Sequence, residues 1–148
     1  MATTTVTRVT PTRREDAFDY VADFTTSARW DPGIAAAVRL DEGELGAGAR
    51  FEVRYRMGLV TVPLVYEITH YARPDRLVLT SRGAAHHGED DVRFEPTDVG
   101  TRVVWTATFG LRGPGRLFEP GLRVGFPRVA AKAGDGLEAA LAELAVQG

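Results

Sequence analysis

The sequence predicts a single α+β domain in which a curved antiparallel sheet of seven strands wraps around a long C-terminal helix. Apolar and polar residues alternate in six short segments between residues 34 and 111, which is the two-residue period of strands. Short turn-rich connections join these segments and favour antiparallel neighbours. The last third of the chain instead has apolar residues at helical spacing. Each strand therefore has one apolar face, and the helix is the segment that can cover it.

Composition narrows the functions that the chain can have. Its 148 residues suit one domain, residues 1–148, with a core that needs no disulfide or structural metal. There is no cysteine, which excludes disulfides, thiolate metal sites and a cysteine nucleophile. The formal charge of −2 predicts no nucleic-acid partner. Lys132 is the only lysine, so a Schiff-base mechanism would depend on that residue alone.

The N-terminal part predicts one strand and two short helices. Residues 3–9 alternate β-branched and polar side chains and favour a strand. Thr12 to Glu15 match a capping box, which predicts a helix from there to about Asp23. The segment 24–31 adds another helical turn or two before Pro32 and Gly33 end it.

Six further strands are expected, at about 34–41, 50–57, 59–71, 76–82, 86–95 and 101–111. In the second of these, Arg54 and Arg56 alternate with apolar residues, so we expect both arginines to face water. Alternation also assigns an inner face to the later strands. The expected inner residues of chemical interest are Tyr55, Tyr66, His70, His86, Asp90, Trp105 and Phe109.

The covering helix is expected to start near Pro127, because proline is tolerated in the first turn of a helix. Residues 115–125 are then a loop or an irregular turn. The apolar stripe of this helix comprises Phe126, Val129, Ala130, Ala133, Leu137, Ala140, Leu141 and Leu144.

Four segments carry a family resemblance: Ala17–Asp23, Trp30–Ile34, Leu45–Phe51 and Gly100–Trp105. With the predicted order of elements, they resemble the helix-grip superfamily of START domains, pollen-allergen-like proteins and polyketide cyclases/dehydrases (SRPBCC). The bacterial polyketide cyclase/dehydrase-like branch is the most similar. The resemblance implies a cavity between the sheet and the C-terminal helix. It does not decide between binding and catalysis, since one fold hosts many functions.

Inward polar side chains are the candidates for chemistry, since burial costs a polar group free energy unless it is paired. His86 and Asp90 share a predicted face and are the candidate catalytic pair, because histidine and carboxyl groups can move protons. The candidate ligand-binding residues are Tyr55, Tyr66, His70, Trp105, Phe109 and Phe126. Each candidate also has a structural interpretation, as a core aromatic, a satisfied histidine or a residue of a solvated acidic loop.

We expect neither a metal nor a cofactor. Neighbouring strand residues such as His86 and His87 point to opposite faces and cannot chelate together, and no nucleotide-binding or metallohydrolase motif occurs.

Three functions remain open at this stage. The domain could bind a small hydrophobic or aromatic molecule, for example as a non-catalytic lipid or metabolite carrier, catalyse cyclisation and dehydration of a poly-β-ketone, or act as a protein-interaction adaptor. The adaptor needs an exposed apolar patch, which the arginine-rich strand faces do not suggest. No secretory signal or membrane span is evident, so we expect a cytoplasmic protein, and the sequence leaves open whether it forms a homodimer.

Overall fold

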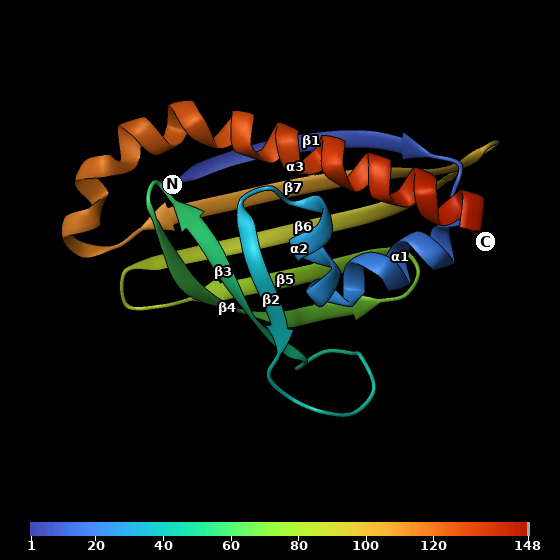
Figure 1. Cartoon of the computed structure of the whole chain (residues 1–148), viewed down its shortest axis with the longest axis horizontal. Helices are drawn as coiled ribbons and strands as arrows, with labels where there is room; N and C mark the ends of the chain where they lie inside the picture. Colours follow the sequence, from blue (N-terminus) through green and yellow to red (C-terminus); the bar gives the residue numbers. More distant parts are fainter. Residues whose placement is uncertain (148) are drawn as a thin grey trace.

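A computed structural model describes residues 1–147 and contains the predicted architecture (Figure 1). Seven strands form one antiparallel sheet in the order β1-β7-β6-β5-β4-β3-β2. The strands are β1 (Ala2–Thr10), β2 (Ile34–Arg39), β3 (Arg50–Met57), β4 (Val60–Ala72), β5 (Arg76–Arg82), β6 (His86–Thr97) and β7 (Gly100–Leu111). The helices are α1 (Arg14–Ala22), α2 (Ser27–Trp30) and α3 (Glu119–Gln147), with 3-10 segments η1 (Phe24–Thr26) and η2 (Gly113–Phe118).

The helix-grip fold is confirmed. All six strands after the short helices lie within about two residues of the ranges that alternation predicts. In Figure 1 the strands β2 to β4 run steeply across the direction of β1 and β7, so the sheet twists strongly, and α3 runs along its inner side. The core comprises inward residues of the sheet together with Phe18, Leu137 and Leu141 from the helices. Among the helices of residues 1–147, none is long and apolar enough to cross a membrane.

Helix α3 starts eight residues earlier than expected, at Glu119 rather than near Pro127. The Glu119 carboxylate accepts a hydrogen bond from the backbone amide of Leu111 at 2.8 Å and binds the amino terminus of Met1. These contacts hold the first turn of α3 against the ends of β1 and β7. Pro127 therefore lies inside the helix, although its missing amide suggested a start.

The expected capping box at Thr12 is wrong. The residue before α1 is Arg13, and no side chain caps the helix. The Thr12 hydroxyl instead donates to the carbonyl oxygen of Leu141 in α3, and the Thr101 hydroxyl donates to the carbonyl oxygen of Thr12 at 2.7 Å. Thr12 thus connects α3 to the sheet, because its hydroxyl is buried and must find a partner.

The expectation that His70 faces inward is also wrong. The pairing of β4 with β5 shifts register between Ile68 and His70, as in a β-bulge. Before the shift, the even-numbered residues of β4 point inward. After the shift, the odd-numbered Tyr71 points inward and packs edge-on against Phe18, with ring centroids 5.1 Å apart. His70 is therefore exposed.

Helix α3 approaches α2 closely at Gly136. A Cβ atom at this position would lie 1.9 Å from the carbonyl oxygen of Trp30 and 2.9 Å from its carbonyl carbon. At Gly136, two turns before Leu144, α3 therefore has no room for a side chain on the side that faces α2. The contact holds Trp30 at a fixed distance from the helix axis.

Candidate functional site

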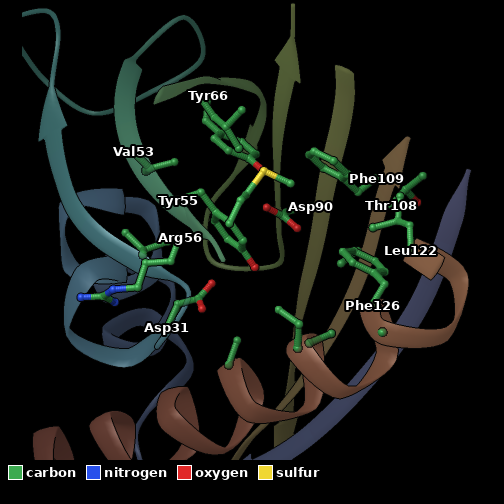
Figure 2. Close-up of a pocket in the computed structure, with 18 of the residues that line it drawn as sticks. Asp31, Val53, Tyr55, Arg56, Tyr66, Asp90, Thr108, Phe109, Leu122 and Phe126 are labelled. Atoms are coloured by element: carbon green, nitrogen blue, oxygen red, sulfur yellow. The ribbon is translucent and has the colours of Figure 1, made fainter. Parts of the chain in front are cut away.

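A cavity of about 310 Å³ lies between the sheet and the first half of α3 (Figure 2). Its lining is mainly apolar, and seven aromatic residues from six elements contribute to it. These are Phe24, Trp30, Tyr55, Tyr66, Trp105, Phe109 and Phe126. On the α3 side the lining includes Gly121, Gly125, Ala130 and Ala133. Small residues in the helix leave the space that larger side chains would fill.

Asp90 of β6 places a half-buried carboxyl group in the wall of this cavity, where surrounding protein shields it from bulk water. The indole Nε1 of Trp105 donates a hydrogen bond to its Oδ1 at 3.0 Å. Burial raises the pKa of Asp90 to about 7, an effect that the Trp105 hydrogen bond opposes and that the charges of Asp31 and Glu89 increase. Near neutral pH this group therefore exists both as a neutral acid and as a carboxylate.

Asp31, in the turn after α2, supplies a second carboxyl group. Its Oδ1 accepts a hydrogen bond from the backbone amide of Gly33 at 2.8 Å. The residue is only 8% exposed, and burial raises its pKa to about 6, although the Gly33 amide lowers it. The cavity therefore contains two acidic groups with raised pKa values from segments nearly 60 residues apart.

The Tyr55 hydroxyl lies between these two carboxyl groups, as Figure 2 shows. Burial raises the pKa of Tyr55, and the charges of Asp31 and Asp90 raise it further. A Cβ atom on Gly33 would come within 2.8 Å of the Tyr55 hydroxyl oxygen, so only glycine leaves room for the phenol here. Tyr55 therefore stays a neutral hydrogen-bond donor at physiological pH.

Tyr66 of β4 adds a second phenol to the group. Its pKa is raised by burial first, then by Asp90, Tyr55 and Asp31. Its hydroxyl lies near Gly88 of β6, where a Cβ atom would be 3.5 Å away. Within residues 1–147 the Tyr66 hydroxyl has no hydrogen-bond partner, so it is free to meet a ligand.

The structure brings together most of the residues that the sequence singled out. Asp90, Tyr55, Tyr66, Trp105, Phe109 and Phe126 all line the cavity. His70 does not, because the bulge in β4 turns it outward. The roles of the lining residues in binding or catalysis stay predictions.

His86 does not pair with Asp90. Four residues of one strand separate them by roughly 13 Å. The His86 ring instead stacks on Phe109, with centroids 5.8 Å apart, and its Nε2 is 2.9 Å from the Ser81 hydroxyl. Burial, then His87 and Arg112, lower the pKa of His86. His86 therefore supports the Phe109 wall, and it is not among the residues that line the cavity.

Sequence reasoning missed Asp31 as a site residue. Asp31 precedes Pro32 and Gly33, so the local sequence predicts only a turn that ends a helix. Its distance from Asp90 in the sequence hides their proximity in space.

Arg56 is exposed, as alternation predicts, yet it borders the cavity and its Nη1 donates to the carbonyl oxygen of Pro32 at 2.8 Å.

A known protein family matches nearly the whole chain. The family described as "Polyketide cyclase / dehydrase and lipid transport" matches residues 1–144. None of the curated proteins matches the chain significantly.

Solved structures share the fold at low sequence identity. TTHA0849 from Thermus thermophilus is 20% identical with a TM-score of 0.81, and the match covers 99% of both chains. A START superfamily protein from Mycobacterium smegmatis is 12% identical with a TM-score of 0.79, covering 97% of this chain and 99% of that one. The di-domain ARO/CYC StfQ from the steffimycin biosynthetic pathway is 14% identical with a TM-score of 0.73, covering 99% of this chain and 52% of that protein.

Proposed function

The chain belongs to the polyketide cyclase/dehydrase and lipid transport family, as its resemblance indicated, and from that premise we propose that it binds a small aromatic or alicyclic molecule in the cavity. The observation that carries the proposal is the cavity itself, in which seven aromatic residues surround a few convergent polar groups. A site that serves only to fill a core would not keep about 310 Å³ empty beside two carboxyl groups.

The cavity volume sets the size of the ligand. It lies at the lower end of the range of about 300–1,000 Å³ that is usual for small-molecule sites. Two or three fused rings with a short substituent suit such a volume, whereas a long-chain lipid would extend outside it.

Ligand binding can be tested with a neutral fluorescent probe, N-phenyl-1-naphthylamine, followed by native mass spectrometry for compounds that purify with the protein. The Gly125→Phe variant places a ring where no atom lies within 4 Å of the glycine Cβ position, beside the cavity. Val99→Phe adds the same ring at a residue that is 71% exposed and serves as the control. We expect Gly125→Phe to weaken probe binding at least tenfold and Val99→Phe to leave it unchanged. Equal binding by both variants, or no probe binding by the parent, would contradict the proposal.

A second candidate function, cyclisation of a poly-β-ketone, is supported by the pKa of about 7 for Asp90. The Asp90 carboxylate would take a proton from the carbon between two ketones, and that carbon would attack a further ketone of the same chain. Tyr55 would donate a hydrogen bond to the oxygen that becomes an alkoxide and then takes up a proton. Asp90 would supply that proton, then take the second hydrogen of the attacking carbon as a proton and pass it to the departing hydroxyl, which leaves as water.

Turnover of a short poly-β-ketone mimic tests this candidate. Catalysis predicts that Asp90→Asn lowers kcat far more than it raises KM, and that the parent rate rises through about pH 7. Unchanged kcat in Asp90→Asn would remove the cyclase candidate and leave the binding proposal intact.

A further inference from the structure

Resting on the proposed function, we propose that the ligand carries a basic nitrogen whose ammonium group lies between the carboxyl groups of Asp31 and Asp90, beside the Tyr55 hydroxyl. Four independent features of the cavity favour this ligand chemistry. They are the unused carboxyl oxygens, the missing counter-charge, the aromatic walls and the unpartnered phenol of Tyr66.

Each carboxyl group has one oxygen occupied and one free. Oδ1 of Asp90 accepts from Trp105, and Oδ1 of Asp31 accepts from the Gly33 amide. In the described part of the chain, no protein donor reaches Oδ2 of either residue. A carboxylate accepts several hydrogen bonds, so each Oδ2 can receive one from a ligand. An ammonium group has up to three N–H donors and can supply both.

Within residues 1–147, no cationic group lies inside the cavity to balance these acids. Arg56 is the one cationic residue of its lining, and its guanidinium group donates to the Pro32 carbonyl and points away from Tyr55 and Asp90 (Figure 2). Glu89, on the outer face of β6, adds negative charge near Asp90. Tyr55 and Tyr66 are neutral. An anionic ligand would therefore be repelled, and a cation would supply the missing charge.

The aromatic walls favour the same kind of ligand. Trp30 and Trp105 meet edge to face, with centroids 5.6 Å apart, next to the Asp90 carboxyl group. Indole and phenol faces attract ammonium groups, by about 0.5–2 kcal/mol for each contact. The Tyr66 hydroxyl, which lines the cavity and has no partner within residues 1–147, can accept from a ligand N–H group as well.

The protonation of the two acids determines how the affinity for a ligand should change with pH. Burial favours the neutral acids in the empty cavity, and the charge of Asp31 further favours neutral Asp90, with pKa values of about 6 for Asp31 and about 7 for Asp90. An ammonium group favours the carboxylates, so its affinity should increase with pH and its binding should release protons. A ketone or other acceptor needs the neutral acids as donors, so its affinity should decrease with pH.

Calorimetric titration with 2-naphthylmethylamine and 2-naphthylmethanol, at about pH 5 and about pH 8, compares two probes that differ in one group. The benzylic ammonium group of 2-naphthylmethylamine has a pKa of about 9, roughly one unit below that of the lysine amine, so the amine stays mainly protonated at both pH values. We expect its affinity to rise at least tenfold from the lower to the higher pH, with proton release detected by changing the buffer. The affinity of the alcohol should change less than threefold.

The Asp31→Asn/Asp90→Asn variant keeps the shape of both side chains and removes their charge. It should lose at least tenfold in amine affinity at the higher pH and keep its affinity for the alcohol. If the amine binds no better than the alcohol at the higher pH, or equally well to parent and variant, the inference is overturned while the proposed function stands. If neither probe binds the parent, both fall. The comparison of the parent at two pH values needs no variant to fold.

Discussion

Replacing Gly136 by alanine tests how firmly α3 is held against α2. The new Cβ atom would lie 1.9 Å from the Trp30 carbonyl oxygen, whereas close carbon–oxygen contacts are about 3.3 Å, so the backbones would have to separate by about 1.4 Å. Both partners are backbone atoms, so no side-chain rotation can relieve the clash. The shift would loosen the packing of Leu137, Ala133 and Trp30, all of which are buried.

Whether Gly136→Ala gains or loses stability is informative, because alanine is a better helix former than glycine and would stabilise α3 if there were no clash. Helix propensity alone would stabilise Gly136→Ala by about 1 kcal/mol. Overpacking of a core costs about 1–3 kcal/mol, and the upper end applies where only backbone can move. We expect a net loss of about 2 kcal/mol, which lowers the midpoint of thermal unfolding by roughly 6 °C in a domain of this size.

Gly125→Ala is the matched control in the same helix. No atom lies within 4 Å of a Cβ at this position, so propensity acts alone and the variant should be as stable as the parent or up to about 1 kcal/mol more stable. Urea denaturation and thermal unfolding followed by circular dichroism measure both variants. If Gly136→Ala is at least as stable as the parent, the close approach of α3 to Trp30 is refuted.

Three other predictions concern the core, the acids and the surface. Leu137→Asp should lower the free energy of unfolding by more than about 3 kcal/mol, because it places a charge against the sheet; a variant that melts like the parent would show that α3 is peripheral. Asp90 has a pKa of about 7 in the folded protein and about 3.9 when unfolded, so its contribution to stability is greatest below about pH 4 and is lost as the pH rises to about 7. Asp90→Asn should therefore gain stability relative to the parent between pH 5 and pH 8 in urea titrations, and a constant difference would contradict the raised pKa. Arg54→Gln should change stability by no more than about 0.5 kcal/mol, whereas Arg56→Gln should cost about 1 kcal/mol through its bond to Pro32, and equal losses in thermal unfolding would show that this bond contributes nothing.

The sequence predicted the sheet well because alternation is a local signal. Phe51 and Val53 are buried while Arg54 is exposed, as a two-residue period requires. The same reasoning failed at His70, since one extra residue in a bulge inverts every face beyond it and leaves no mark in the pattern.

The sequence pattern could not predict features that depend on contacts between distant segments. The start of α3 depends on Glu119 meeting Met1 and Leu111, which the local pattern around Pro127 does not contain. Asp31 comes close enough to influence Asp90 only because the turn after α2 lies against β3. A local pattern could find the inward residues of a strand, but it could not find which turn completes the cavity.

The two tryptophans of this chain are both in the cavity wall, which gives the protein a built-in optical reporter. Trp30 and Trp105 are 4% and 8% exposed, so their emission should be blue-shifted in the folded state and should come from the site alone. Since the Trp105 indole donates to Asp90, its fluorescence should also follow the titration of that acid. Unlabelled protein can therefore be monitored for occupancy and for carboxyl protonation in a single cuvette experiment.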